Sequence, residues 1–388
     1  MPEPEFRLIV HAGPHDRSHC PVRVTLSEPL PEGEWELAAD SSQTRPLQRL
    51  EGNEVVFLET ALRAGESRTY RVRPHQTPDK TSLPVVTKVA AVTLTHAEGE
   101  RIEIQTNGSL LTRYIYGNVP ARPYFFPLIG PQGIRITRSY PMEDVPGEMQ
   151  DHPHHRSLWI AFGEVNGADN WSEEPGHGYT LHQSVDRLED GEVAGRFATT
   201  SLWARADKTP LLTQRLAVTV WGTDASVRLL DFDIRLEATH GDVHFGDTKE
   251  GGILSTRVAS AMDVPRGGRI ENVYGGVNEG ETWGKAAHWC DYSGVVEGQQ
   301  VGIAILDHPL SFRYPTHWHV RDYGLMTANP FGYAAFTNGV KDGSYTLQAG
   351  DALEFHYRLV LHRGNASEGR VNAHYLNFVA PPRVEVTP

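Results

Sequence analysis

Short runs of apolar and β-branched residues recur along the chain, and each run ends at a cluster of Gly, Pro, Asp or Asn residues. Runs of this kind are typical of β-strands separated by turns. No segment keeps an apolar period of about 3.6 residues over more than roughly three helical turns, so long helices are not expected. The pattern therefore predicts an all-β protein. The clearest expected strands are Phe6–His11, Val22–Leu26, Val55–Glu59, Thr69–Val72, Val92–Thr95, Arg101–Gln105, Leu216–Trp221, Val227–Leu236, Val301–Leu306 and Leu353–Leu361.

The spacing of these strands predicts two units. Within residues 1–80 the expected strands are short and about ten residues apart, which is typical of a small β-sandwich of the immunoglobulin type. The polar, proline-bearing segment 74–80 is suited to a linker. Residues 88–388 are numerous enough for a large two-sheet β-sandwich, and they hold all the dense polar and aromatic motifs. We therefore expect the chemistry in the second unit and a supporting or interaction role for the first.

Composition narrows the expected partners. The 388 residues carry a formal net charge of −13, which argues against nucleic acid or an anionic membrane as the main partner. No apolar run approaches the roughly 20 residues that a membrane-spanning helix needs. The acidic N-terminus lacks the basic and apolar regions of a signal peptide, and Cys20 and Cys290 lie too far apart in the sequence to suggest a disulfide framework. A cytoplasmic location is therefore expected.

The segment Asp151–Trp159 holds one acid, three imidazoles and a guanidinium beside an apolar Leu-Trp pair. Histidine changes charge near neutral pH and is the commonest metal ligand, so the cluster indicates proton transfer or metal binding. In an extended segment His152 and His154 would share one face, where they could bind a divalent metal together with a carboxylate, while His155 would point to the other face. The alternative is acid/base chemistry, with His155 as a catalytic group and Arg156 binding the substrate.

The segment Gly163–Trp171 places acids and amides beside an indole. Sugar-binding sites need this mixture, because carboxylates and amides bind hydroxyl groups while an aromatic ring covers the apolar face of a pyranose. A plain turn with one packed tryptophan would have the same composition. Trp171 is the residue that we expect to stack on a sugar.

The segment Phe245–Val258 begins with an Asp-Thr-Lys-Glu run flanked by glycines and continues into an expected strand. Asp247 and Glu250 are candidate catalytic acids or bases, and Lys249 is a candidate substrate-binding cation. The order of residues differs from that of a phosphate-binding loop. An exposed turn with a local ion pair is the competing interpretation.

Two later segments, Trp283–Tyr292 and Pro315–Gly324, again combine aromatic rings with titratable groups. His317 and His319 would share one face of a strand, and Arg321 would extend the same stripe. His319 is a further candidate acid or base. The candidate substrate-binding residues in this part of the chain are Trp289, Asp291, His317, Arg321 and Asn329.

Taken together, these motifs resemble a bacterial family of unknown function that carries the automatic label "methane oxygenase PmoA". That label fits poorly, because particulate methane oxygenase subunits are membrane-bound and this chain has no spanning run. Members of the family accompany sugar-oxidising dehydrogenases and sugar isomerases, so the resemblance implies a carbohydrate context. A large sandwich with histidines and acids on a concave sheet is also similar to the galactose-mutarotase superfold. The stretches that carry the family resemblance are Asp151–Trp159, Gly163–Trp171, Phe245–Val258, Trp283–Tyr292, Asp307–Pro309 and His317–Gly332.

The function that we expect is acid/base chemistry on a small-molecule carbohydrate, by an epimerase, a lyase or a hydrolase of a sugar or oxidised glycoside. His155 and Glu250 are the expected acid/base pair, with Asp247 and His319 in reserve. The alternatives are a non-catalytic carbohydrate-binding module and a soluble metal-dependent oxygenase, and a homo-oligomer is compatible with each. A single site requires the histidines near residue 152 and those near residue 318 to lie together.

Overall fold

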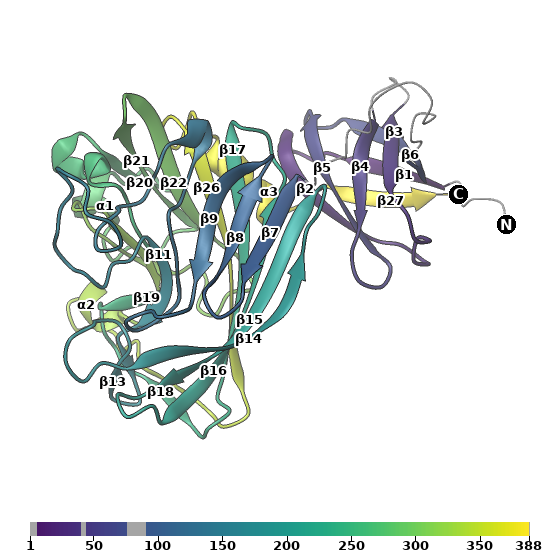
Figure 1. Cartoon of the computed structure of the whole chain (residues 1–388). Coiled ribbons are helices and arrows are strands. Elements are labelled where there is room, and N and C mark those ends of the chain that lie inside the picture. Colours follow the sequence, from purple (N-terminus) through teal and green to yellow (C-terminus); the bar gives the residue numbers. More distant parts are fainter. Residues whose placement is uncertain (1–5, 40–43, 76–90, 388) are drawn as a thin grey trace.

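The computed structural model describes residues 6–39, 44–75 and 91–387. Strands dominate it, whereas the α-helices of these residues are α1 (Asn278–Thr282), α2 (Tyr333–Phe336) and α3 (Val371–Val379), none longer than nine residues. Figure 1 shows a large body of stacked sheets and a smaller sheet beside it, close to both termini. The all-β class with a large and a small unit, predicted from the strand-and-turn pattern, is confirmed.

The small unit is one nearly closed antiparallel sheet with a hydrophobic core of its own. Its edge strand is β27, which pairs with β1, so the two ends of the chain meet in this sheet. Sequence reasoning assigned all of residues 88–388 to the large unit, and the pairing of β27 corrects that boundary. Most of the expected linker, from residue 76 onward, lies outside the described residues. In spatial order the strands are β2 (Arg17–Thr25), β5 (Glu54–Leu62), β4 (Thr44–Arg49), β3 (Trp35–Ala39), β6 (Ser67–Pro74), β1 (Phe6–His11) and β27 (Arg383–Thr387).

The large unit is a sandwich of two eight-stranded antiparallel sheets, which we call sheet I and sheet II. Sheet I has the order β23 (His317–Val320), β24 (Leu325–Asn329), β19 (Gly251–Arg257), β11 (Leu158–Phe162), β10 (Tyr124–Phe125), β9 (Ser109–Ile115), β8 (Arg101–Thr106) and β7 (Val92–Ala97). Sheet II has the order β14 (Tyr179–Glu189), β15 (Ala194–Ala204), β16 (Pro210–Trp221), β17 (Val227–Glu237), β26 (Ala352–Arg363), β22 (Gln299–Asp307), β21 (Trp289–Val296) and β20 (Arg269–Asn272).

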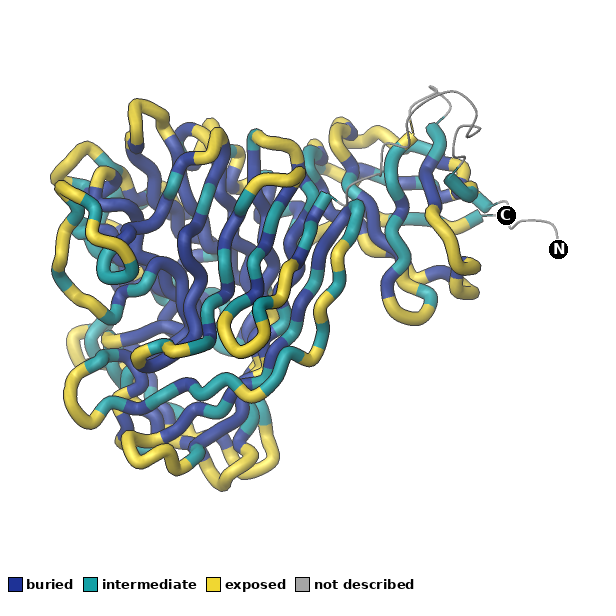
Figure 2. Tube along the Cα trace, viewed as in Figure 1, coloured by how far each residue is buried: buried dark blue, intermediate teal, exposed yellow. Residues whose placement is uncertain are grey.

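The main core lies between these two sheets. Leu158, Ile160 and Leu254 of sheet I belong to the same buried cluster as Phe232 and Leu359 of sheet II. Alternate residues of each strand point inward, as strand geometry requires. Figure 2 shows the resulting pattern, with buried strands through the body and exposed residues mainly in the connecting loops.

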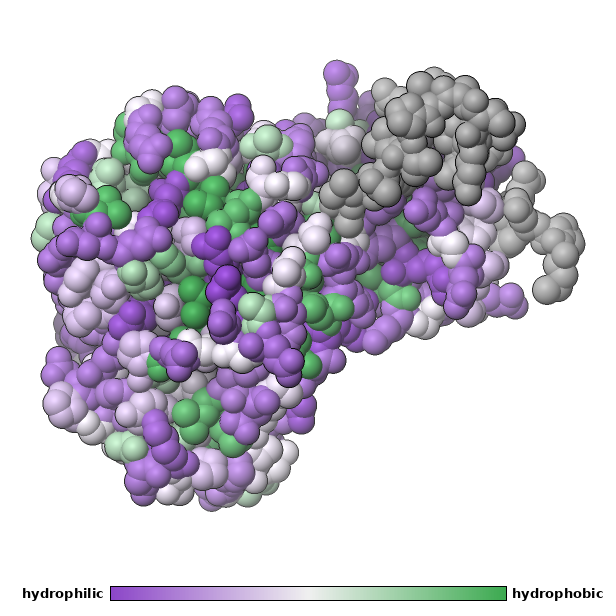
Figure 3. Space-filling view, viewed as in Figure 1, coloured by the Kyte–Doolittle hydropathy of each residue, from purple (hydrophilic) through white to green (hydrophobic). Residues whose placement is uncertain are grey.

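A four-stranded sheet and several short connections complete the large unit. The sheet has the order β13 (Ala168–Asp169), β12 (Glu164–Val165), β18 (Val243–Phe245) and β25 (Tyr345–Leu347). The visible face in Figure 3 is mostly hydrophilic with scattered apolar patches. Within the described residues, no helix has the length and apolar character needed to cross a membrane.

The face of sheet I that points away from the core positions the candidate chemistry. Trp159 pairs with Ser255, Ser255 with Thr327, and Thr327 with His319, so these four side chains form one row across β11, β19, β24 and β23. The ends of this row are three strand spacings apart, which is roughly 14 Å. His155 stacks on Trp159 with ring centroids 5.4 Å apart, so both histidine groups named from the sequence lie on the same side of one sheet.

Candidate functional site

A cavity of about 330 Å³ lies where three of the sequence motifs meet, and we call it the histidine pocket. It is near the lower end of the size range of small-molecule sites. One motif contributes the turn before β11, the second the loop around β12 and β13, and the third the loop between β18 and β19. The residues that line the pocket are His152, His154, Gly163, Glu164, Asp169, Trp171, Ser172, Thr248 and Glu250.

The turn that carries the histidines is compact, which corrects the expectation of an extended segment. His152 adopts a left-handed backbone conformation with φ of 43°, and its carbonyl accepts a hydrogen bond from the backbone N–H of His155 at 3.0 Å. As a result the rings of His152 and His155 stack, with centroids 4.8 Å apart and planes 6° apart. The ring of His154 stands edge-on to that of His152 at 5.8 Å, so the expected shared face is absent.

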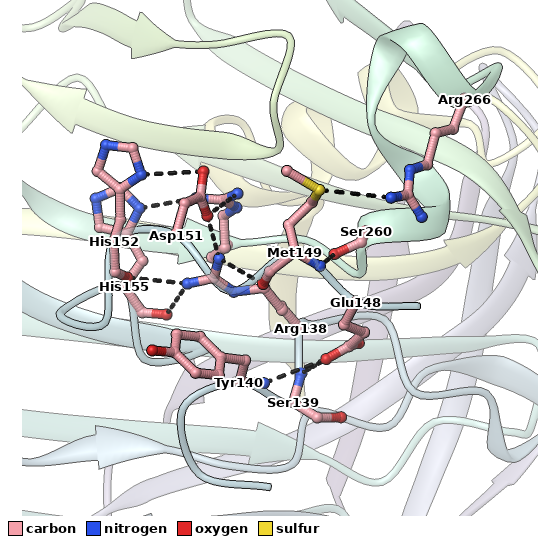
Figure 4. Close-up of polar contacts among 11 residues, drawn as sticks. Arg138, Ser139, Tyr140, Glu148, Met149, Asp151, His152, His155, Ser260 and Arg266 are labelled. Atoms are coloured by element: carbon pink, nitrogen blue, oxygen red, sulfur yellow. Dashed lines mark hydrogen bonds and ion pairs between the residues drawn. The ribbon is translucent and has the colours of Figure 1, made fainter. Parts of the chain in front are cut away.

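The carboxylate of Asp151 holds this turn against two buried arginines, Arg257 and Arg138, of which Arg138 is labelled in Figure 4. It accepts hydrogen bonds from Arg138 Nη1 at 2.5 Å and Arg257 Nη2 at 2.8 Å, and His152 Nδ1 lies 3.1 Å away. Burial alone would raise the pKa of Asp151, but the charges of Arg257 and Arg138 and the hydrogen bond with His152 outweigh it and lower the pKa. Asp151 therefore acts as a charged anchor for the turn.

His155 is a buried part of this network. It is 1% exposed and does not line the histidine pocket, so the expectation that it touches substrate is corrected. Its Nδ1 lies 3.1 Å from Arg257 Nη1. A guanidinium can only donate, so Nδ1 accepts and the proton of the neutral ring is on Nε2. Burial, reinforced by His154 and Arg257, holds the pKa of His155 well below its usual value.

His154 lines the pocket and has a strongly lowered pKa. Its pKa is lowered to about 4, first by burial and then by the charge of Arg122. Its ring meets the edge of Trp171 at 5.8 Å, and its ring nitrogens have no hydrogen-bond partner among the described residues. His154 is therefore neutral at pH 7 and free to donate to a ligand through one nitrogen and accept through the other.

The loop between β18 and β19 places Glu250 in the lining of the histidine pocket. Glu250 is about half exposed and forms an ion pair with Lys249. The loop packs so closely on Gly163 that a Cβ there would lie 2.2 Å from the backbone oxygen of Glu250. Asn329 fixes the loop from below, because its side-chain amide donates to the carbonyls of Thr248 and Lys249 at 3.0 and 3.3 Å. Asn329 thus positions the loop instead of lining the pocket as a substrate-binding group.

Asp247 holds the same loop to α2 and is not in the pocket lining. Its carboxylate accepts hydrogen bonds from the backbone N–H of Ala334 at 3.0 and 2.8 Å and from that of Gly343 at 2.5 Å. Both oxygens are therefore occupied by the backbone. This corrects the expectation of Asp247 as a reserve catalytic acid.

The segment around β12 and β13 contributes two carboxylates to the pocket, Glu164 and Asp169, and they differ in whether they are already hydrogen-bonded. Glu164 is exposed and lies against Gly246. Asp169 instead accepts hydrogen bonds from the backbone N–H of Trp171 at 2.8 Å and of Ser172 at 2.9 Å, as well as from the Ser172 hydroxyl at 2.5 Å. These bonds shape the turn and lower the pKa of Asp169 against the opposing effect of burial. Trp171 presents only 3% of its surface, so it forms a packed floor.

Arg156 is directed away from the pocket lining toward a carboxylate that sequence reasoning missed. Its Nε and Nη2 donate to the two oxygens of Glu173, each at 2.8 Å. This fork satisfies both groups and removes Arg156 from the expected substrate-binding set.

The second histidine group lies on the same face of sheet I but outside the pocket. His319 is 2% exposed, and its Nδ1 accepts a hydrogen bond from Trp283 Nε1 at 2.9 Å. Burial, together with the charges of Lys249 and Arg321, lowers its pKa to about 3. His317 packs on Tyr333 with ring centroids 4.6 Å apart. These contacts support β23 and correct the expectation that the two histidines touch the ligand.

Tyr323 contacts the first histidine group from the strand pair that carries the second. It stacks on His152 with centroids 5.2 Å and planes 8° apart, and it lies in the turn between β23 and β24. The neighbouring Arg321 is paired with Glu279 at 3.2 Å, which leaves it outside the pocket lining. Tyr323 was not singled out from the sequence, because an aromatic residue in a turn has many uses.

Trp289 and Asp291 lie on β21 of sheet II, away from the histidine pocket. Trp289 is 7% exposed and packs in an apolar cluster with Tyr375 of α3. Asp291 is fully buried and 2.7 Å from His362 Nε2. Burial raises the pKa of Asp291 although His362 opposes it. Trp289 therefore packs in the core instead of stacking on a ligand, and Asp291 pairs with His362 instead of binding one.

No metal centre is assembled by the described residues. Among them, no group of three His, Cys, Asp or Glu side chains is arranged to hold an ion. His152 is turned toward Asp151 and His154 toward Trp171, so the ligand pair expected from the sequence does not converge.

Several residues that shape the pocket were missed from the sequence. Glu164, Ser172 and Thr248 line it. Arg257 on β19 and Arg138, which precedes the histidine turn in the sequence, hold that turn in place. Glu164 stood within a recognised motif, so its acidic side chain was a usable signal. The two arginines had none, because only the folded chain brings them to Asp151.

Comparison with known proteins gives one match to a solved structure and a family. No curated protein matches the chain. A solved structure of a protein in glycosyl hydrolase family 38 from Enterococcus faecalis is 10% identical and aligns over 100% of this chain and 48% of its own, with a TM-score of 0.42. This chain thus spans about half the length of that protein. A family model matches residues 101–376, which include every residue of the histidine pocket, and the chain therefore belongs to DUF6807, a family of unknown function.

Proposed function

We propose that the histidine pocket is the active site of a carbohydrate-active enzyme that transfers protons next to a carbonyl or anomeric carbon. The observation that carries the proposal is the neutral, unpartnered imidazole of His154, which faces the same cavity as the carboxylate of Glu250. Proton transfer at carbon needs a base on one side and a group that stabilises the developing oxyanion on the other.

In the proposed mechanism Glu250 removes the proton and His154 donates a hydrogen bond to the carbonyl oxygen. A neutral imidazole is suited to this second role, because it keeps an N–H that can donate to the carbonyl oxygen. Lys249 forms an ion pair with Glu250 and so lies beside the proposed base. Delivery of a proton to the other face by a second acid, for which the pocket offers Glu164, would be epimerisation, and loss of a leaving group from the adjacent carbon would be lyase cleavage.

The rest of the pocket supplies groups that bind sugar hydroxyls. Glu164 offers a carboxylate, and Ser172 and Thr248 offer hydroxyls that can donate or accept. If the reaction is instead hydrolysis of a glycoside, Glu164 and Glu250 would be the pair of carboxylates that such a mechanism needs. His155 would then act as a positioning residue behind the turn, since it is buried beneath the pocket histidines.

The alternatives use the same pocket differently. A carbohydrate-binding module would employ the hydroxyls and Glu164 without needing a neutral imidazole opposite a carboxylate. A metal-dependent oxygenase would need a three-ligand arrangement, and the described residues offer no such set.

The proposal is tested by incubating the protein with simple sugars, glycosides and 3-keto-glycosides and following the products by NMR. Wild-type protein should convert at least one of them, and Glu250→Gln should reduce turnover by about 100-fold, the lower end of what a positioned acid or base contributes. Glu174→Gln is the matched control, because Glu174 is exposed nearby but does not line the pocket. Binding without turnover in any sample would favour a binding module and overturn the proposed catalysis.

A further inference from the structure

A second cavity lies at the junction of the small N-terminal sheet and sheet II, and we call it the junction pocket. Its volume is about 320 Å³, and it shares no residue with the histidine pocket. Strand β2 contributes to one side, β17 and β26 to another, and α3 to a third. Ligand sites occur preferentially at such boundaries between units. The charged and imidazole side chains that line it are Arg23, Asp231, Asp233, His308, His356 and Arg358.

Asp231 and Arg358 form a closed pair on the floor of this pocket. Arg358 donates through Nε and Nη2 to the two oxygens of Asp231 at 2.6 and 2.8 Å, and Trp221 Nε1 donates to the second oxygen at 2.9 Å. The carboxylate is thereby satisfied. Arg358 is only 3% exposed, yet its Nη1 has no hydrogen-bond partner among the described residues. One buried, charged donor is thus left over.

Asp233 and His356 form the second pair. His356 Nδ1 lies 2.6 Å from Asp233 Oδ1. That hydrogen bond is the main reason why the pKa of His356 is raised, against the effect of burial. His308 contributes no charge at neutral pH, because burial and the nearby His356 lower its pKa. Both carboxylates of the pocket therefore already have a hydrogen-bonded partner, Arg358 for Asp231 and His356 for Asp233.

Arg23 is the cation that remains. It is exposed on β2, and its guanidinium lies over the ring of Trp221, 5.4 Å from the ring centre. No acidic side chain of the described residues pairs with it. Because Asp231 is paired with Arg358 and Asp233 with His356, Arg23 is the charged side chain of this lining that has no partner among the described residues.

The lining of the junction pocket also includes apolar side chains. Leu310 is 72% exposed, which is unusual for a large aliphatic side chain in this protein. Phe378 of α3 lies under the guanidinium of Arg358, 4.5 Å from its ring centre, and prolines also belong to this lining. An inorganic anion would leave this apolar surface unused, whereas a ligand with both a carboxylate and a hydrocarbon part would cover it.

We propose that the junction pocket binds a small organic carboxylate. The carboxylate would lie between Arg23 and Nη1 of Arg358, and the hydrocarbon part would lie against Leu310 and Phe378. Since Arg23 belongs to the N-terminal sheet and Arg358 to sheet II, the ligand would hold the two units together and stabilise the folded chain. This inference is independent of the chemistry proposed for the histidine pocket.

The test uses the full chain with benzoate as the probe, and with acetate and inorganic phosphate for comparison. Benzoate should bind with a Kd below about 1 mM by calorimetry and raise Tm, while acetate and phosphate should bind at least about tenfold more weakly. Arg23→Gln should weaken benzoate binding by about tenfold through loss of a charge-assisted hydrogen bond. Arg63→Gln, which removes an exposed arginine elsewhere in the small unit, should leave it unchanged.

A second variant tests the apolar part of the lining without touching the buried pairs. Leu310→Ser should weaken benzoate binding about fivefold and leave acetate binding as it was, because only the hydrocarbon contact is lost. The folded state should be unaffected, since Leu310 is exposed. Equal binding of benzoate and phosphate, equal effects of Arg23→Gln and Arg63→Gln, or no benzoate binding at all would each overturn the proposal.

Discussion

Replacing Arg257 by methionine tests whether the buried network sets the state of the histidine turn. Arg257 is fully buried on β19, where it donates to His155 Nδ1 at 3.1 Å and to Asp151 at 2.8 Å and lies 4.8 Å from the ring centre of Tyr323. Methionine has a similar length and fills the space but supplies no donor. The change therefore removes the hydrogen bonds while keeping most of the packing.

The expected loss of stability follows from these contacts. Leaving His155 Nδ1 buried without a partner costs about 1–3 kcal/mol. The lost hydrogen bond to Asp151 is worth about 1.5–3 kcal/mol, reduced because that carboxylate is one third exposed and keeps Arg138. Relief of repulsion offsets part of the loss, since the charge of Arg257 is the second cause, after burial, of the lowered pKa of Arg138. We expect a net decrease of about 3 kcal/mol in the free energy of unfolding.

The assay has two readouts. Urea unfolding of Arg257→Met should show that decrease, while Arg266→Met, which removes a more exposed arginine of the same charge, should change stability by less than about 0.5 kcal/mol. Nitrogen-15 NMR should show the Nε2–H form of His155 in the wild type and a mixture of tautomers in Arg257→Met. A stability loss below about 1 kcal/mol together with an unchanged tautomer would refute the role assigned to Arg257.

Three further predictions concern other parts of the molecule. His154 should stay neutral by NMR titration down to about pH 5, because its pKa is lowered to about 4, and a normal titration near pH 6.5 would contradict the burial argued for it. Burial raises the pKa of Asp307 to about 7, so the folded state holds that proton more tightly than the unfolded state and loses stability as pH rises from about 4 to 7. Unfolding of Asp307→Asn should show less of this loss, and identical pH profiles for both proteins would disprove the assignment. Gly163→Ala should destabilise the protein by about 1–3 kcal/mol and lower turnover, because the new Cβ would lie 2.2 Å from a backbone oxygen, whereas Gly280→Ala, which meets open space, should not.

The sequence predicted which segments form strands and which carry polar motifs. It did not predict where these segments lie relative to one another in space. Alternating short apolar runs were sufficient for the all-β class, because strand patterning is local. The pairing of β27 with β1 depends on the two ends of the chain meeting, and no local pattern encodes it. The motifs around His152, Glu164 and Glu250 were recognised separately, and their convergence in one pocket emerged only from the order of strands in sheet I and the loops between them.

The roles of single residues were the least predictable part. His155 was chosen from a strand-like alternation, but the left-handed backbone at His152 turns it inward. The sequence suggested that Asp247 and Arg156 could bind a ligand. In the fold, Asp247 accepts hydrogen bonds from backbone N–H groups and Arg156 donates to Glu173. A polar side chain offers its chemistry to a ligand only when the rest of the chain leaves it unpaired, and that is a property of the tertiary structure.

The measurement that bears most directly on the central claim is solvent deuterium exchange at the carbon next to the carbonyl of a 3-keto-glucoside. Wild-type protein in D₂O should incorporate deuterium there, Glu174→Gln should do so at the same rate, and Glu250→Gln should be slower by about 100-fold. Exchange that is equally fast in Glu250→Gln and wild type, or no exchange above the rate without protein, would contradict the assignment of Glu250 as the base that removes this proton.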